Sequence, residues 1–258
     1  MAFSPDSRTY PGSGNAATMA AAMDAGLRAY MLRVYNWMSS GLVLTGIVAY
    51  GIANSALIDL FYPLVQAPNG MMVHQPTILA WIAMFAPLAF VMVLSFGVQR
   101  LSATAVQAIF WCYAAAMGAS LTNIFLIYTG ASVVRVFFIT AGTFAAMSIW
   151  GYATRTDLTK MGSFLIMGLF GIILASLVNM FLGSAGLQFA ISVLGVLIFT
   201  GLTAYDTQRI KATYLQAAYA DGPQEATKRS VFDALSLYLN FINLFMFLLQ
   251  FMGDRRSN

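Results

Sequence analysis

Seven long apolar stretches alternate with polar connections along the chain. A run of about 20 predominantly apolar residues is long enough to cross the hydrocarbon core of a bilayer as a helix. That length predicts an all-α integral membrane protein with seven transmembrane helices, at residues 31–53, 77–97, 103–128, 131–153, 163–182, 186–207 and 231–252. The helices form one domain, residues 31–252, between a polar N-terminal segment, residues 1–30, and a short tail, residues 253–258.

Composition supports a membrane protein. Of 258 residues, 60% are hydrophobic and 9% are charged, whereas soluble domains carry roughly a quarter charged residues. The single cysteine, Cys112, lies inside an apolar span, so the chain cannot build a disulfide framework or a cysteine metal site.

The connections between the spans alternate in charge. Those at 98–102, 154–162 and 208–230 contain Lys and Arg, and those at 54–76, 129–130 and 183–185 contain neither. Because positively charged loops stay in the cytoplasm, we expect a cytoplasmic N-terminus. Seven crossings then place the C-terminus outside. Arg255 and Arg256 in the tail favour the opposite side, and a shallow seventh segment is the alternative.

The last two spans carry polar stripes at helical spacing. On the sixth the stripe includes Thr203 and Asp206, and on the seventh it consists of Asp233, Ser236, Asn240 and Asn243. Polar groups inside a membrane are tolerated against protein or a water-filled cavity. We therefore expect the stripes to face each other along an interior seam that either conducts ions or is purely structural.

Asp206 is the candidate for function in this seam. A carboxylate near bilayer depth is costly to keep, so a functional role is the default hypothesis. Arg100, in the connection after the second span, is the arginine expected to approach it from the cytoplasmic side. Such a pair would hold two helix ends together until the carboxylate is protonated. The alternative for Arg100 is a role in topology alone.

Known catalytic motifs are missing from the sequence. There is no HExxH motif, no phosphate-binding glycine loop and no lysine within the predicted spans. His74, the single histidine, is predicted to be an ordinary solvated residue in the outer connection. We therefore predict no enzyme activity, no cofactor and no nucleic-acid partner.

Several strings resemble the Bax inhibitor-1/YccA family, also called the transmembrane Bax inhibitor motif family. The strings with the highest specificity are Tyr205-Asp-Thr-Gln208 and Leu237-Tyr-Leu-Asn-Phe-Ile-Asn243, and Gly151-Tyr-Ala-Thr-Arg-Thr-Asp-Leu158 adds to them. The resemblance covers nearly the whole chain from about Gly26 and is strongest to bacterial members.

The resemblance implies a fold in which the last of seven helices is surrounded by the other six. It also implies a pH-sensitive calcium leak, closed by two aspartates on the sixth and seventh helices that share a proton. Asp206 matches the first aspartate, but Asn240 stands at the position of the second. Arg100 lies near an arginine that pairs with the first aspartate in some bacterial relatives.

The asparagine has chemical consequences. A single carboxylate makes Asp206 only a weak candidate ligand for Ca²⁺, and without a proton-sharing partner we expect a shallower pH response. Asp233 lies about two turns, roughly 10 Å, nearer the cytoplasm than Asn240. It is expected to act as a charge at the mouth, with Thr203 and Asn243 along the ion path.

The sequence therefore predicts a multi-pass protein of the bacterial inner membrane. Its partners would be the lipid bilayer and Ca²⁺ or another cation, and its function a passive cation leak gated by Asp206. The alternative is a non-conducting regulator that binds a membrane-anchored ATP-dependent protease.

Overall fold

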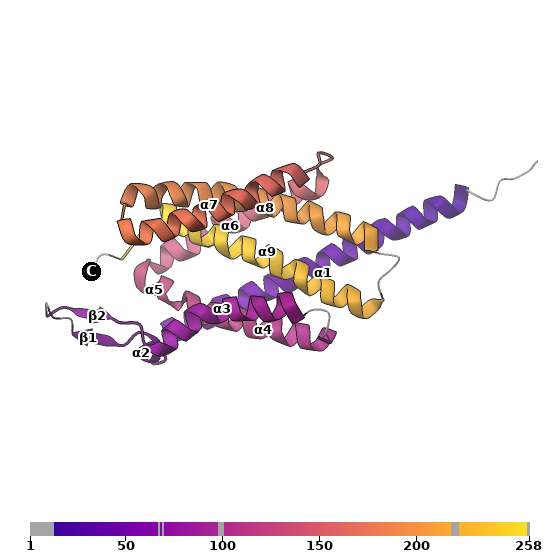
Figure 1. Cartoon of the computed structure of the whole chain (residues 1–258). Coiled ribbons are helices and arrows are strands. Elements are labelled where there is room, and N and C mark those ends of the chain that lie inside the picture. The colour runs from indigo at the N-terminus through magenta and orange to yellow at the C-terminus, as the bar shows by residue number, and fades with distance from the viewer. Residues whose placement is uncertain (1–12, 67, 69, 98–100, 218–221, 257–258) are drawn as a thin grey trace, which may run out of the picture.

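The computed structural model describes residues 13–66, 68, 70–97, 101–217 and 222–256. Within these ranges it contains seven long helices, a few short helical turns and one hairpin (Figure 1). The long helices are α1 (Ser13–Ala53), α3 (Ile78–Gly97), α4 (Ala103–Ser120), α6 (Gly130–Ala153), α7 (Thr159–Leu182), α8 (Ala185–Ala217) and α9 (Pro223–Met252). The 3₁₀ turn η1 (Leu121–Asn123) and α5 (Ile124–Ile127) continue α4.

Five helical segments of the described chain are long and apolar enough to cross a membrane. They are Ala103–Ile127, Gly130–Ala153, Thr159–Leu182, Ala185–Gln216 and Gln224–Met252. The first of them joins α4, η1 and α5. These five segments support a membrane-spanning bundle. Helices α1 and α3 are not among them, so seven crossings stay a prediction.

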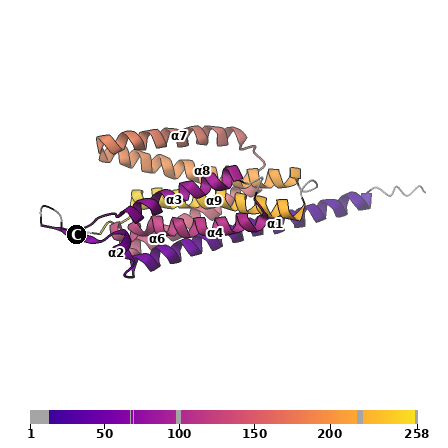
Figure 2. The same cartoon turned by 60° about the horizontal axis from the view of Figure 1, so that its bottom comes forward.

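Helix α9 lies between other helices in both views, and in Figure 1 it runs between α1, α3 and α4 on one side and α6, α7 and α8 on the other (Figures 1 and 2). It packs against α1, α4, α6 and α8, and it is the most buried of the five apolar segments. Its closest packing is therefore with four helices instead of the six that the family resemblance implied. Helices α3 and α7 pack mainly on α4 and α8, which separate them from α9.

Helix α1 begins at Ser13, well before the apolar run that starts at residue 31. Its 41 residues make a rod of about 60 Å, and its N-terminal part projects beyond the other helices (Figures 1 and 2). The apolar run marks the part of a helix that can lie in the hydrocarbon core of the bilayer. The first residue of the helix is set by backbone hydrogen bonding, which can begin before that run. The polar segment from Ser13 onward is therefore continuous with the first apolar helix.

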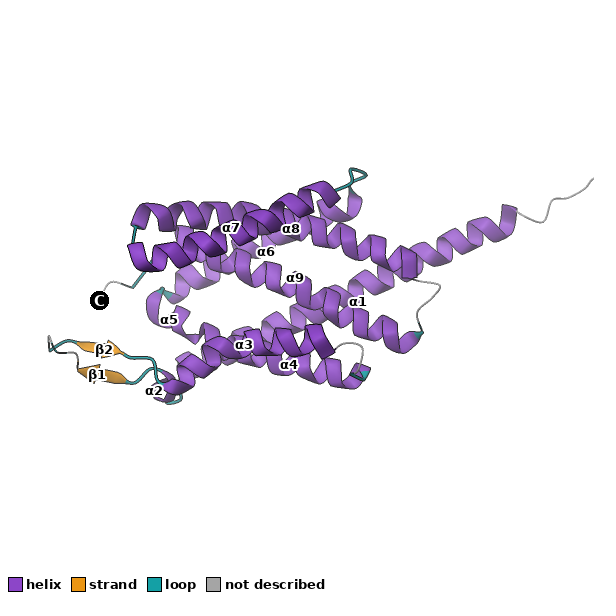
Figure 3. Cartoon of the chain, viewed as in Figure 1, coloured by secondary structure: helices purple, strands orange, loops and turns teal. Residues whose placement is uncertain are grey.

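The connection after α1 contains the only pair of β-strands in the described residues. The short helix α2 (Ile58–Phe61) precedes strands β1 (Leu64–Gln66) and β2 (Met72–His74), which pair antiparallel with Val65 opposite Val73 (Figure 3). Gly70 supports the turn with a φ of 81°, a conformation that glycine adopts without strain. The expected all-α fold is thus corrected by a small hairpin, whose strands satisfy each other's backbone groups.

The C-terminal tail is attached to the end of the bundle that carries this hairpin. Thr129 donates its N–H to the Asp254 carbonyl at 3.0 Å, and Arg256 donates its N–H to the Ile127 carbonyl at 2.9 Å. The Asp254 carboxylate also pairs with Arg135 at 2.7 Å. Figure 1 shows this end opposite to the projecting part of α1. We call it the outer end, and the end with the α6–α7 and α8–α9 connections the inner end.

Glycines allow helices to approach closely near the inner end. A Cβ atom on Gly151 of α6 would lie 2.8 Å from the Cα atom of Ala204 on α8. On Gly162 of α7 it would overlap the ring of Tyr205. Ala204 and Tyr205 directly precede Asp206, so these contacts position the carboxylate relative to α6 and α7.

Candidate functional site

Asp206 is held at the inner end of α8 by two partners, one for each carboxylate oxygen. Its Oδ2 accepts a hydrogen bond from Asn240 Nδ2 of α9 at 2.7 Å. Its Oδ1 forms an ion pair with Arg209 Nη2 at 2.9 Å, and the Asp206 side chain is only 13% exposed. A largely enclosed carboxylate is thus compensated by one amide and one guanidinium group.

Asn240 provides the link between α8 and α9. Its side chain is buried, and its amide donates a hydrogen bond across the interface between the two helices to Asp206. Helical spacing had predicted that the polar stripes of the last two spans face each other, and this hydrogen bond joins the two residues on which that prediction depended. A hydrogen bond to an ionised carboxylate is roughly twice as strong as one between neutral groups.

Among the described residues, Arg209 is the arginine that pairs with Asp206, while the expected approach of Arg100 stays a prediction. Arg100 lies outside the described residues, and Arg209 follows Asp206 by three positions on the same helix. The apolar run of the sixth span ends at residue 207, which predicts a loop at Arg209, but α8 continues to Ala217. The ion pair therefore lies within one helix. Arg209 also reaches α9, where it donates to Ser236 Oγ at 3.3 Å.

Asp233 contacts a different helix from Asp206. Its Oδ2 accepts a hydrogen bond from the Tyr30 hydroxyl of α1 at 2.6 Å. Arg209, Arg229 and Asp206 are the charges that interact with it. The two carboxylates of the seam thus belong to one charged cluster at the inner end, but Asp233 links α9 to α1 while Asp206 links α8 to α9.

The other predicted members of the ion path turn their polar groups to their own helices. Thr203 Oγ1 donates to the Phe199 carbonyl at 2.8 Å, and Asn243 Nδ2 donates to the Leu239 carbonyl at 2.8 Å. Both bonds run one turn back along the helix. Thr203 is fully buried, so its hydroxyl contacts protein in this conformation.

The outer end of the same seam is connected by amide side chains. Gln188 Nε2 of α8 donates to Gln250 Oε1 of α9 at 2.9 Å, and Asn179 Nδ2 of α7 donates to Gln188 Oε1 at 3.1 Å. Ser192, one turn after Gln188 on α8, reaches Gln250 at 3.4 Å. The seam between α8 and α9 is therefore joined by side-chain hydrogen bonds at both ends.

The described residues contain no cluster of three or more His, Cys, Asp or Glu side chains that could hold a metal ion. Both Asp206 oxygens already have partners. A cation at this site would compete with Arg209 and Asn240 for a single carboxylate, so the arrangement offers a poor ligand set for a stable calcium site.

Gln208 is a site residue that the motif contained but the sequence analysis did not assign. Its Oε1 accepts the N–H of Leu158 at 2.8 Å, and its Nε2 donates to the Thr156 carbonyl at 2.8 Å. The side chain thereby fastens the α6–α7 connection to α8, two residues after Asp206. The nearby Asp157 lies just before α7, and its carboxylate accepts the Thr159 N–H at 2.9 Å. Hydrogen bonds from the Thr159 side chain and from this N–H lower the pKa of that exposed carboxyl.

Replacing Gln208 by alanine is expected to lower the free energy of unfolding by about 1–3 kcal/mol, because two backbone groups lose their partner. Thermal unfolding in detergent would measure the change. Gln216→Ala, on an exposed position of the same helix, is the control and should leave the midpoint nearly unchanged. Equal midpoints for the two variants would contradict the role of Gln208.

Comparison with known proteins adds independent information. The sequence profile of a family described as "Inhibitor of apoptosis-promoting Bax1" matches residues 27–257. The inner membrane protein YbhL of Escherichia coli (strain K12) is 44% identical over 233 residues, which cover 90% of this chain and 94% of the relative. An uncharacterized protein of Rickettsia prowazekii is 45% identical over 91% of this chain and 93% of its own. A membrane protein of Streptococcus pyogenes is 36% identical over 89% of this chain and 94% of its own.

Proposed function

The chain belongs to the Bax inhibitor family, and from this membership and the surroundings of Asp206 we propose that it is a proton-sensitive passive leak for Ca²⁺ or a similar cation. Asp206 is the titrating group of the gate. The protein works in the bacterial inner membrane, as its relative in Escherichia coli is named, with its N-terminus in the cytoplasm.

One observation carries the proposal: each oxygen of the Asp206 carboxylate has a separate partner, and one of them crosses to α9. Protonation removes the charge that holds Arg209. It also turns the bond from Asn240 into a weaker bond between neutral groups. A single proton therefore weakens the contact between α8 and α9 at the inner end, where Arg209 and Ser236 add a second link between the same helices.

The conformation described above corresponds to the closed state of this leak. Thr203 and Asn243 use their side chains on their own helices, and the hydrogen bonds of Gln188 and Gln250 join the outer end. Opening would separate α8 from α9 and expose these polar groups to water. A hard cation takes oxygen ligands, and the carboxylate and amide oxygens of the seam are of that kind.

Flux measurements in liposomes test the proposal. A Ca²⁺-sensitive dye inside vesicles would report the influx rate between pH 5 and 8 for the wild type and for Asp206→Asn. We expect wild-type flux to rise by about tenfold as the pH falls, because a single proton controls opening. We expect Asp206→Asn to be insensitive to pH at the acidic wild-type level, because an amide cannot hold Arg209 by charge.

Asp254→Asn is the matched control, because Asp254 also pairs with an arginine but lies at the outer end. It should keep the wild-type pH profile. A wild-type rate equal to that of empty liposomes at every pH would refute the leak and leave the non-conducting regulator of a membrane protease. A pH response retained in Asp206→Asn would show that another group is the sensor.

A further inference from the structure

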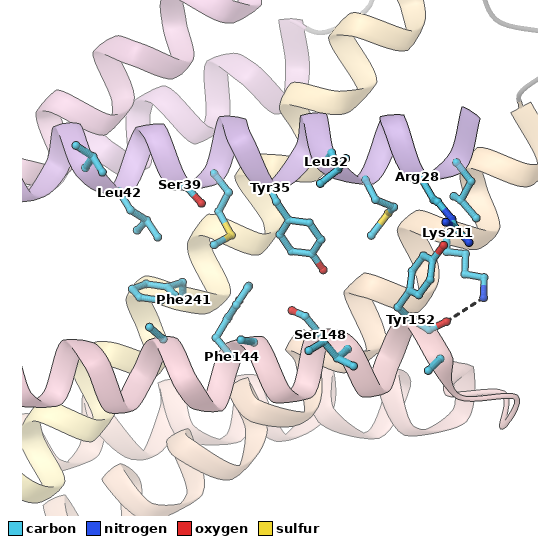
Figure 4. Close-up of a pocket in the computed structure, with 18 of the residues that line it drawn as sticks. Arg28, Leu32, Tyr35, Ser39, Leu42, Phe144, Ser148, Tyr152, Lys211 and Phe241 are labelled. Carbon is cyan, nitrogen blue, oxygen red and sulfur yellow. Dashed lines mark hydrogen bonds between the residues drawn. The ribbon is translucent and has the colours of Figure 1, made fainter. Parts of the chain in front are cut away.

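A large groove lies between α1 and α6 (Figure 4). Its volume is about 1210 Å³, more than the roughly 300–1,000 Å³ of a pocket for a drug-sized ligand. Tyr35 projects into it from α1 and Phe144 from α6, and Phe241 of α9 forms part of its floor. The groove therefore has the size for an extended, largely apolar ligand.

Small residues leave the space between α1 and α6 unfilled along the groove. Gly46 of α1 and Ala141 and Ala145 of α6 are among its lining residues. A Cβ atom added to Gly46 would meet no other heavy atom within 4 Å. A second cavity of about 560 Å³ shares Gly46 and Phe241 with the groove and extends toward Arg256 at the outer end. The open space thus runs along much of the apolar length of α1.

The lining is apolar and its edges face outward. Leu32 and Ile47 of α1 are 63% and 64% exposed, and Ile149 of α6 is 70% exposed. In a bilayer such side chains are surrounded by lipid. From Arg28 to Ile47, α1 rises about 28 Å, which is longer than the half-thickness of the hydrocarbon core, about 15 Å. The groove is therefore long enough to hold the whole length of an acyl chain of the inner leaflet.

The inner mouth of the groove carries a cation. Lys211 Nζ donates to the Tyr152 carbonyl at 2.9 Å and lies 4.7 Å from the centre of the Tyr152 ring. Arg28, at the same mouth, is paired with Asp24 at 3.3 Å. Lys211 forms no ion pair with any carboxylate of the described residues. An ammonium group has three N–H donors, so two of them can serve an anionic ligand.

A second polar group lies one turn deeper. Ser148 is 5% exposed, and within the described chain its hydroxyl has no hydrogen-bond partner. Figure 4 shows it on the side of α6 that faces α1. Residues 148 and 152 are about 6 Å apart along the axis of α6. The mouth thus offers a cation for a phosphate group and, just below it, a hydroxyl for an ester carbonyl.

We propose that this groove is a binding site for an anionic phospholipid of the inner leaflet, with its phosphate at Lys211, an ester carbonyl at Ser148 and an acyl chain between α1 and α6. The order of these groups along the groove matches the order of phosphate, ester and hydrocarbon in a phospholipid. Each basic residue near a membrane surface favours anionic lipid. The site is independent of the gate at Asp206.

Native mass spectrometry of the full-length protein tests the site. The protein would be released from detergent containing equal amounts of phosphatidylglycerol and phosphatidylcholine, and the bound lipids would be counted. We expect wild type to retain phosphatidylglycerol about fivefold more than phosphatidylcholine. Lys211→Gln should reduce this ratio to about one, and Lys211→Arg should restore most of it. Lys160→Gln, an exposed lysine on α7, should leave the ratio unchanged.

A matched pair of glycine substitutions tests the location. Gly46→Phe places a ring in the groove, whereas Gly51→Phe places the same ring on α1 outside both cavities. A Cβ atom meets nothing within 4 Å at either position, so both variants should fold. We expect Gly46→Phe to lose at least half of the retained phosphatidylglycerol and Gly51→Phe to lose none. Equal retention by these two variants, or equal retention of both lipids by wild type, would overturn the proposal.

Discussion

Replacing Asn240 by aspartate is expected to change the pH profile of flux from a single step to a profile with two limbs. Wild type should open only on acidification, because Asp206 alone loses its charge. In Asn240→Asp, two carboxyl groups meet where Asn240 now lies 2.7 Å from Asp206. Such a pair shares one proton, and the hydrogen bond through this proton holds the two carboxyl groups together. A second proton would release the pair at acidic pH, as in wild type.

The new limb arises when the shared proton is lost at higher pH. Two carboxylates about 4 Å apart repel each other by about 4 kcal/mol at an effective dielectric constant of 20. Since 1.4 kcal/mol corresponds to a factor of ten in an equilibrium, we expect flux on the alkaline side to rise at least tenfold above its minimum. The liposome assay used for Asp206→Asn, extended to pH 9, would measure it.

Asn243→Asp is the matched control for this variant. It makes the same substitution one turn further along α9, where the side chain bonds to the carbonyl of Leu239. Without a carboxylate opposite, it should show no alkaline limb. If Asn240→Asp lacks the limb, or if both variants show it, the contact between Asp206 and residue 240 does not control opening. Thermal unfolding of both variants would verify that they are folded.

Sequence periodicity predicted that the polar stripes of the last two spans face each other, whereas the family resemblance singled out Asp206 and Asn240 as the pair. Asp206 and Asn240 lie on polar stripes of two successive apolar helices. Polar groups inside a membrane are tolerated where they face protein or a water-filled cavity, so two such stripes are expected to face each other. The same physical constraint identifies the apolar segments that suit a membrane. These features depend on local spacing, which a single sequence contains.

The ends of the helices could not be predicted in this way. Helices α1, α8 and α9 all extend beyond their apolar runs, because a helix continues into water as long as its own hydrogen bonds and its packing support it. This extension places Arg209 one turn from Asp206 and carries the N-terminal part of α9 beyond the predicted span. The signal was present as an Asp and an Arg three positions apart, a spacing that brings side chains together on a helix.

Contacts between distant segments were also beyond the sequence. Nothing in the string Tyr205-Asp-Thr-Gln208 indicates that its glutamine fastens the α6–α7 connection. Likewise, Asp254 and Arg135 form an ion pair because the tail after α9 lies against the start of α6. Such contacts depend on the relative placement of whole helices, and the groove between α1 and α6 depends on it in the same way.

Gly151→Ala is expected to destabilise the crossing of α6 and α8. The added Cβ atom would lie 2.8 Å from the Cα atom and 2.9 Å from the carbonyl carbon of Ala204. Both are backbone atoms of α8 and cannot move aside as a flexible side chain would. We expect the free energy of unfolding to fall by about 1–3 kcal/mol, the usual cost of overpacking. Thermal and denaturant unfolding in detergent would measure the loss.

Gly142→Ala makes the same change two and a half turns earlier on α6, where a Cβ atom meets nothing within 4 Å. It should be neutral or stabilising by up to about 1 kcal/mol, because alanine favours a helix over glycine. The two variants thus share composition and helix propensity and differ only in the contact with α8. Gly151→Ala should also raise flux at neutral pH, since moving α6 away from Ala204 disturbs the turn that carries Asp206. Equal stability of the two variants would show that α8 yields at this crossing, and the contact would then not position the gate.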